Sequence, residues 1–207
     1  MKKDPDLEDA YALGTPEAMR ELYRTWAHSY DVGFGDSQGF QLPREVALAF
    51  IAAGGVGPIL DVGAGTGLVG EQFQAMDVGP VDAIDLSPDM LQVAEMKGVY
   101  RYLSEADVIK PLLGHPRYSG IVSSGTFTLG HVGPEGIVAL LDAAAPDAQF
   151  VITVNAMHFE SAGFAAMLND LGEKIHSLTL KDVRIYDDRA DSAHRQDMAR
   201  LLIFRAV

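Results

Sequence analysis

Residues 58–76 read PILDVGAGTGLVGEQFQAM, and this stretch decides the fold. Its first five residues form a short apolar run that ends in glycines, and residues 68–76 follow with helical spacing. A short apolar run bounded by turn residues is typical of a buried strand. Glycine tolerates the positive φ angles of a tight turn. We therefore predict a strand, a glycine loop and a helix in this order.

The same alternation continues along the chain. Strands separated by helices indicate parallel strand–helix–strand units, so we predict a doubly wound α/β fold with a mostly parallel seven-stranded sheet. The last two strands have no full helix between them, so this pair, including the C-terminal strand, is predicted to form an antiparallel edge of the sheet. The further expected strands are 81–86, 99–107, 118–125, 149–155, 177–187 and 199–207, and the further expected helices are 88–98, 134–145 (stopped by Pro146) and 160–175.

Two helices are expected before this region, within residues 15–55. Thr15, Pro16 and Glu17 have the order of an N-cap, a first helical position and an acidic first turn. A second helix should follow Pro43 and end at the glycines 54–55. With 1–14 as a flexible tail and 58–207 as the α/β core, and with no repeat or linker, residues 1–207 form one expected domain.

The composition limits the possible chemistry. The 207 residues include no cysteine, which excludes disulfides, thiolate zinc sites, iron–sulfur clusters and a cysteine nucleophile. The longest apolar runs, 46–53 and 137–141, are far shorter than the ~20 residues of a membrane span. Residues 1–14 are too acidic for the apolar part of a signal peptide. We expect a cytoplasmic protein that does not interact with membranes.

The charge indicates which partners fit. Lys and Arg number 16 against 29 Asp and Glu, so the net charge is −13. A polyanion would be repelled, and no basic stripe interrupts the acidic surface, so nucleic acid is not an expected partner. The six histidines are scattered without the spacing of metal ligands, and no metal site is expected.

The glycine loop is the expected ligand site. In doubly wound sheets, ligands bind beyond the carboxyl ends of the strands at the switch point, and the following helix offers free N–H groups to an anion. Residues 65–70 also match the dinucleotide pattern G-x-G-x-x-G, with Asp85 twenty residues beyond Gly65. However, Asp61 would repel a pyrophosphate and would favour a ligand with an ammonium and a sulfonium, such as S-adenosylmethionine.

Four segments resemble a known family in order and spacing. The segment ILDVGAGTGLVG (59–70) resembles motif I of the class I S-adenosylmethionine-dependent methyltransferases, and DLSPDML (85–91), EADV (105–108) and YSGIVSSGTF (118–127) resemble their later motifs. A closer likeness is to the methyltransferase-like proteins associated with Williams–Beuren syndrome. It rests on the pattern of Leu22, Tyr23, Trp26, Ala27, Tyr30 and Asp31, with Ser87, Pro88, Met90, Leu91, Gly98, Tyr100, Gly130 and Val132.

The resemblance implies N-terminal helices that cap the pocket and a role for each matching residue. Asp61 would orient the loop and balance the positive charge of the cofactor, and Asp85 would accept two hydrogen bonds from the ribose. Leu86 and Met90 would flank the adenine, and Asp107 would accept from its amino group. The implied cofactor-binding residues are Asp61, Gly63, Ala64, Gly65, Gly67, Asp85, Leu86, Met90, Ala106, Asp107, Ser124 and Tyr30.

The predicted function is methyl transfer from S-adenosylmethionine to a small-molecule acceptor by direct displacement, in a monomer or a homodimer. A general base is needed only if the acceptor arrives protonated, and His131, His158 and Tyr30 are candidates. Ser123 and Ser124 stand where amine- and base-modifying relatives carry an acid or Asn-Pro-Pro-Tyr. Two alternatives stay open: an NAD-dependent oxidoreductase, which Asp61 and the lack of Tyr-x-x-x-Lys disfavour, and a non-catalytic S-adenosylmethionine-binding regulatory protein.

Overall fold

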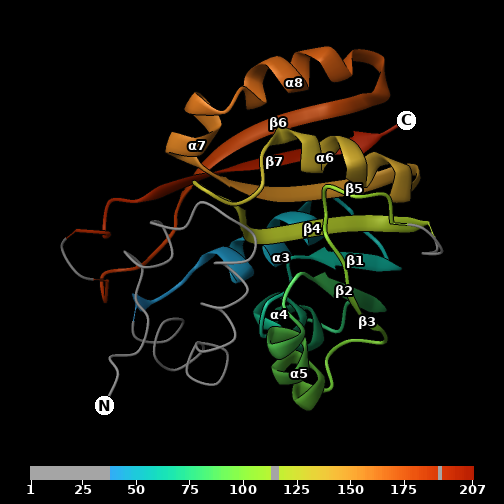
Figure 1. Ribbon diagram of the computed structural model, residues 1–207, viewed down its shortest axis with the longest axis vertical. Helices are drawn as coiled ribbons and strands as arrows, with labels where there is room; N and C mark the ends of the chain where they lie inside the picture. Colours follow the sequence, from blue (N-terminus) through green and yellow to red (C-terminus); the bar gives the residue numbers. More distant parts are fainter. Residues whose placement is uncertain (1–37, 113–116, 191–192) are drawn as a thin grey trace.

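A computed structural model describes residues 38–112, 117–190 and 193–207, which form a sheet with helices on both faces (Figure 1). The expected tail 1–14, the first expected helix and Tyr30 lie outside the described residues. Within the described part of the chain, no helix has the length and apolar character that crossing a membrane requires.

The elements follow the predicted alternation. The strands are β1 (Ile59–Val62), β2 (Val81–Asp85), β3 (Leu103–Glu105), β4 (Tyr118–Phe127), β5 (Ala144–Asn155), β6 (Ile175–Arg184) and β7 (Met198–Ala206). The helices are α3 (Leu42–Ala52), α4 (Leu68–Ala75), α5 (Pro88–Lys97), α6 (Pro134–Leu140), α7 (Ala156–Ser161) and α8 (Phe164–Leu171), with short 3₁₀ turns η2 (Leu141–Ala143) and η3 (Gly172–Lys174).

The seven strands form one sheet in the order β3-β2-β1-β4-β5-β7-β6. Strands β1 to β5 pair in parallel, whereas β7 is antiparallel to both β5 and β6. This confirms the predicted fold class, with one refinement: β7 lies inside the sheet and β6 forms the edge. Because β1 has β2 on one side and β4 on the other, the strand order reverses beside β1, and this is where such sheets open a crevice.

Two apolar layers hold the helices against the sheet. On one face, α3 and α4 bring Phe50 and Phe73 edge to face, with ring centroids 5.4 Å apart. On the other face, α6, α7 and α8 cover Phe150 and Phe204, which stack at 4.6 Å. Burying aromatic pairs of this size accounts for much of the stability of such a core. The carboxyl ends of the central strands are thereby held in fixed positions.

Several predicted boundaries differ from those of the structure. The expected strand 99–107 shrinks to β3, and the expected helix 160–175 is two helices separated at Gly163, where φ is +84°. The expected helix 134–145 ends at Leu140, and Pro146 lies within β5 rather than stopping a helix. The pairing of β4 with β5 shifts register beside Pro146, and a bulge of this kind is one of the few places where a strand accepts proline.

Candidate functional site

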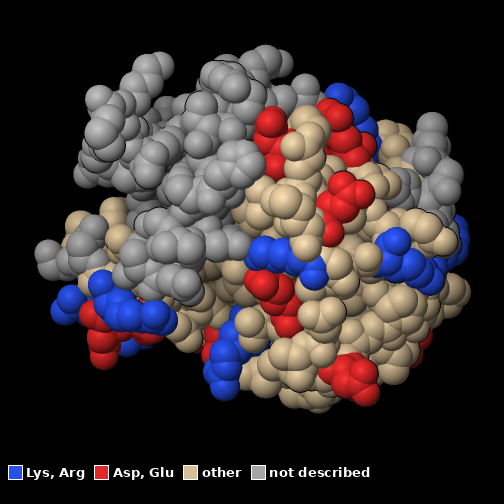
Figure 2. Space-filling view, turned by 90° about the horizontal axis from the view of Figure 1, so that it is seen from below, with Lys and Arg blue, Asp and Glu red and all other residues tan. Residues whose placement is uncertain are grey.

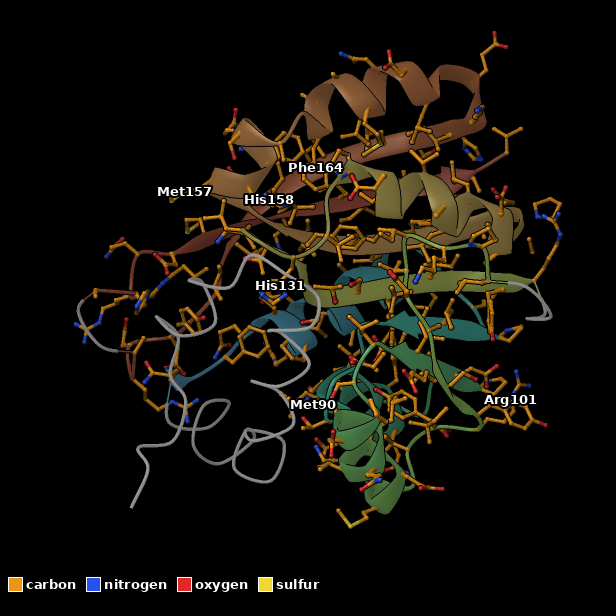
Figure 3. All side chains as sticks on the ribbon, viewed as in Figure 1. Met90, Arg101, His131, Met157, His158 and Phe164 are labelled. Atoms are coloured by element: carbon orange, nitrogen blue, oxygen red, sulfur yellow. The ribbon has the colours of Figure 1, made fainter. Side chains whose placement is uncertain are left out.

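A cavity opens at the carboxyl ends of β1, β2 and β4. Including its open mouth, it encloses about 1040 Å³ of empty space. Figure 3 shows Met90 and His131 near the carboxyl ends of the strands and Arg101 near their amino ends. The lining residues are Phe40, Pro43, Gly63, Ala64, Gly65, Thr66, Leu68, Val69, Ile84, Asp85, Leu86, Ser87, Met90, Ala106, Asp107, Val108, Ser124, Gly125, Thr126, His131 and Val132.

The glycine loop between β1 and α4 forms one wall of the cavity. The amides of Gly63 and Ala64 both donate to the carbonyl of Ile84, at 2.9 and 3.1 Å, which fastens the loop to β2. Gly63 and Gly65 have φ angles of +66° and +54°, which side chains rarely adopt. A Cβ atom on Gly65 would meet no atom within 4 Å. The backbone itself is therefore exposed to a ligand.

Asp85 closes the loop from the end of β2. One carboxylate oxygen accepts from the amide of Gly65 and the other from the amide of Ser87, each at 2.8 Å. Burial raises the pKa of Asp85, and the bonds from backbone amides oppose this rise. Asp85 therefore ties the glycine loop to the start of α5, one oxygen to each, while its carboxylate lines the cavity.

The far wall comes from α5 and from the segment after β3. The Ser87 hydroxyl accepts from the amide of Met90 at 3.3 Å and so forms the N-cap of α5. Ala106 donates its amide to the carbonyl of Asp85 at 3.0 Å. Asp107 is half-buried in the cavity wall and forms an ion pair with Lys110 at 3.1 Å. The structure thus brings together most of the residues that the motifs predicted.

Asp61 lies behind the loop and does not line the cavity, and neither does Gly67. Asp61 is 0% exposed, and its Oδ2 accepts from the Tyr100 hydroxyl at 2.6 Å. Its Oδ1 is buried without a hydrogen-bond partner. Burial, together with the charge of Asp85, raises the pKa of Asp61 to about 7, although the bond from Tyr100 lowers it. Asp61 can therefore influence a ligand in the cavity through its charge and through the loop, without touching it.

The end of β4 contributes a polar patch. The Ser124 hydroxyl oxygen is buried without a hydrogen-bond partner, in the cavity wall. The Thr126 hydroxyl donates to the carbonyl of Val62 at 3.1 Å and fastens β4 to the start of the loop. Sequence reasoning missed Thr126, because a threonine that packs against a glycine has no sequence pattern of its own.

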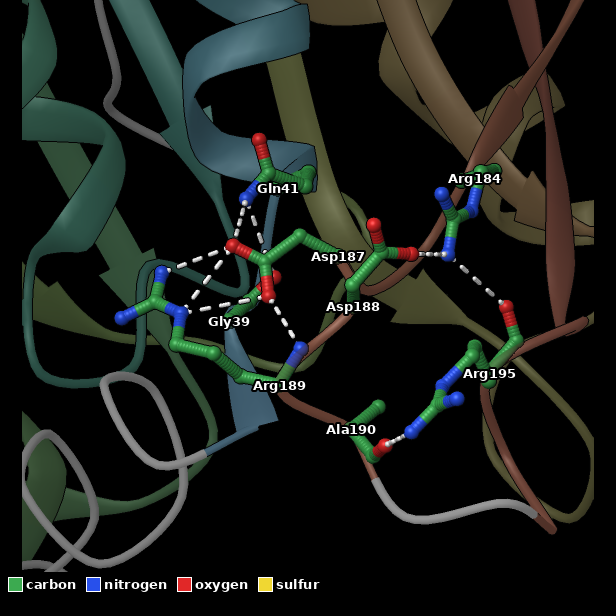
Figure 4. Close-up of polar contacts among 8 residues, drawn as sticks. All are labelled: Gly39, Gln41, Arg184, Asp187, Asp188, Arg189, Ala190 and Arg195. Atoms are coloured by element: carbon green, nitrogen blue, oxygen red, sulfur yellow. Dashed lines mark hydrogen bonds and ion pairs between the residues drawn. The ribbon is translucent and has the colours of Figure 1, made fainter.

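The segment before α3 supplies an apolar wall that sequence reasoning also missed. Phe40 lines the cavity, and its two neighbours are bonded to the connection that follows β6 (Figure 4). The amide of Gln41 donates to the carbonyl of Ile185, and the amide of Asp187 donates to the carbonyl of Gly39, each at 2.9 Å. Gly39 has φ of +64°, and a Cβ atom there would collide with the Asp187 carboxylate. Contacts between residues almost 150 positions apart fix Phe40.

The two candidate histidines occupy different places. His131 lines the cavity. His158 is 9% exposed and lies outside it, with Nε2 2.9 Å from the carbonyl of Val132 and its ring edge-on to Phe164 at 5.2 Å. The structure thus places His158 behind the cavity wall, with its Nε2 against the carbonyl of the wall residue Val132. Among residues 38–112, 117–190 and 193–207, no three His, Asp or Glu side chains gather closely enough to hold a metal ion.

The sheet order, the glycine loop after β1 and the carboxylate at the end of β2 together define the class I methyltransferase fold. Solved structures share it. The chain matches magnesium protoporphyrin IX methyltransferase from Synechocystis PCC 6803 with a TM-score of 0.65 and 18% identity, over 95% of this chain and 99% of that one. It matches a TehB-like S-adenosylmethionine-dependent methyltransferase from Corynebacterium glutamicum with a TM-score of 0.61 and 18% identity, over 92% of this chain and 100% of that one.

A sequence relative points in the same direction. The chain is 30% identical over 130 residues to human methyltransferase-like protein 27, covering 58% of this chain and 52% of that protein. The chain thus spans about half the length of the curated relative that it matches. No protein-family model matches it.

Proposed function

We propose that this chain is an S-adenosylmethionine-dependent methyltransferase that acts on a small-molecule acceptor. The observation that carries the proposal is the charge of the cavity. Two carboxylates line it, Asp85 and Asp107, and no Lys or Arg lines it within the described residues. Such a cavity suits a cofactor that carries a sulfonium and an ammonium, and it disfavours the pyrophosphate of a dinucleotide.

The residues present fit this cofactor in two further respects. Gly65 leaves open space where a side chain would stand, so a ligand can lie directly against the loop backbone. Ser124 Oγ is buried in the cavity wall without a partner, and buried polar atoms are normally paired. We propose that Asp85 accepts from the ribose hydroxyls, that Leu86 and Met90 pack against the adenine, and that Asp107 accepts from its amino group.

The protein's part in the reaction is to position two molecules. When bound, the cofactor supplies a methyl group made electrophilic by the sulfonium, and no further activation of the methyl is required. The chain's own residues hold the reactants in line and exclude water, which can contribute about 7–11 kcal/mol of the barrier. His131, in the cavity wall, is positioned to accept a proton from an acceptor that arrives protonated.

The small-molecule acceptor is supported by charge and by analogy. The net charge of −13 repels polyanions. One structural neighbour, the Synechocystis enzyme, is named for a small-molecule substrate, magnesium protoporphyrin IX. A screen of small acceptors follows proof of cofactor binding.

A calorimetric titration tests the proposal directly. The purified protein is titrated in parallel with S-adenosylmethionine, S-adenosylhomocysteine and NAD⁺. We expect micromolar binding of the first two and no binding of NAD⁺. Binding of NAD⁺ alone would replace the proposal with an oxidoreductase. Cofactor binding with no methyl transfer in a broad acceptor screen would favour a regulatory, non-catalytic protein.

A further inference from the structure

Tyr100 lies beneath the glycine loop, although it comes from the segment between α5 and β3. Its hydroxyl donates to Asp61 Oδ2 at 2.6 Å and accepts from the amide of Gly70 at 3.1 Å. Gly70 lies in the first turn of α4, where amides have no partner within the helix. One hydroxyl therefore joins the acid of β1 to the start of the helix that follows it.

Tyr100 accepts a hydrogen bond from a first-turn amide of α4, which is the usual function of an N-cap side chain. The N-cap of α4 is Gly67, which has no side chain to accept from the first-turn amides. N-cap oxygens normally accept from the second or third amide of the helix, and Gly70 is the third residue of α4. The phenol of Tyr100 supplies that oxygen from a segment 30 residues away.

The ring also explains two glycines of the loop pattern. A Cβ atom on Gly67 would lie 3.2 Å from Tyr100 Cε2, and one on Gly70 would lie 2.6 Å from Cζ. Gly70 is the last glycine of the G-x-G-x-x-G match, which sequence alone relates to a dinucleotide. In this structure its missing side chain makes room for Tyr100.

We propose that Tyr100 is a positioning residue of the cofactor site, whose single hydroxyl holds Asp61 and the first turn of α4 together and so fixes the glycine loop. This inference rests on the proposed function, because the loop matters only if it binds a cofactor. Tyr100 does not line the cavity and acts through Asp61 and Gly70.

Among the described residues, two groups act on the pKa of Asp61 besides its burial. Asp85 raises the pKa of Asp61 from the end of β2, and Tyr100 lowers it from the segment before β3. On the packed helices, Glu71 of α4 forms an ion pair with Lys97 of α5 at 2.8 Å, and Glu45 of α3 forms one with Lys181 at 3.3 Å. Removing the Tyr100 hydroxyl should therefore raise the pKa of Asp61 further and leave it neutral near pH 7.

The test is the pH profile of cofactor binding in Tyr100→Phe. In the unmodified protein, the affinity for S-adenosylmethionine should rise with pH between about 6 and 8 as Asp61 ionises. In Tyr100→Phe the rise should move to higher pH, and the affinity at pH 7 should fall roughly tenfold, as expected for a lost hydrogen bond to a charged group. The ionisation of the ligand is common to both proteins and cancels in the comparison.

Tyr118→Phe is the matched control. Tyr118 also donates to a buried aspartate, Asp82, at 3.0 Å, but this pair lies near the amino ends of the strands, away from the cavity. Tyr118→Phe should lower the melting temperature and leave the pH profile of binding in place. If Tyr100→Phe behaves in the same way, Tyr100 is a structural residue only and the inference is wrong.

A double-mutant cycle shows whether Tyr100 acts through Asp61. In an Asp61→Asn background, adding Tyr100→Phe should cause no further shift of the pH profile. A full additional shift would overturn the inference.

The free protein separates this inference from the proposed function. A raised native pKa means that the folded protein holds a proton that the unfolded chain has lost, so the contribution of Asp61 to stability falls as pH rises from about 4 to 7. In Tyr100→Phe the fall should extend to higher pH, and in Asp61→Asn it should be absent. If the unmodified protein binds no S-adenosylmethionine, the proposed function is wrong. Independently of binding, melting curves that coincide for Tyr100→Phe and the unmodified protein would reject the role of Tyr100.

Discussion

Two aspartates at the ends of neighbouring strands have different surroundings. Asp85 accepts from two backbone amides and lines the cavity, whereas Asp61 accepts from one phenol and is fully buried. Burial raises the pKa of both carboxyls, and the partners of each oppose this rise. Asp85 can therefore meet a ligand directly, while Asp61 can influence it only through charge and through the loop.

Asp85→Asn should weaken S-adenosylmethionine binding by about 2 kcal/mol, because a neutral amide replaces the acceptor of two charge-assisted hydrogen bonds. Calorimetry on both proteins measures the change. Asp89→Asn is the control, because it replaces the same carboxylate by the same amide in the first turn of α5, at a residue that does not line the cavity. Equal affinities in Asp85→Asn and the unmodified protein would remove Asp85 from the proposed site.

At the scale of the element, the loop from β1 to α4 depends on the backbone freedom of its glycines. Gly65→Ala should cost about 1 kcal/mol of stability, because alanine at positive φ is strained, and should also weaken cofactor binding, because the methyl would enter the cavity. Gly163, at the N-cap of α8, also has positive φ and open space around it. Gly163→Ala should lower the melting temperature by a similar amount and leave cofactor binding unchanged, and parallel melting and titration experiments would expose any departure.

Local patterns predicted the elements that depend on local chemistry. The order of strand β1, glycine loop and helix α4 was predicted correctly, since it rests on residues adjacent in sequence. The roles of Asp85 and the other site residues stay predictions. Pro146 misled the prediction because a bulge against β4 accepts it within β5. Phe40 and the packing of Tyr100 were not predicted, since each acquires its place from contacts that join distant segments.

At the scale of the whole molecule, the net charge of −13 governs which partners can approach. Figure 2 shows Lys and Arg side chains in separate spots beside acidic ones, on the face seen from below. Nucleic acids bind proteins mainly through clustered positive charge. A labelled RNA or DNA duplex should therefore show no change in fluorescence anisotropy with this protein at about 150 mM salt, where the Debye length is about 8 Å. Salt-sensitive binding would revive a nucleic-acid acceptor.

The place of β7 between β5 and β6 has a consequence for synthesis. A ribosome releases β6 before β7, yet β6 pairs only with β7 among the named strands. Until β7 has been made and has paired, the newly made edge strand has no partner in the sheet. During that interval its backbone N–H and C=O groups are open to any other strand, so this is the moment at which a nascent chain would most need a chaperone.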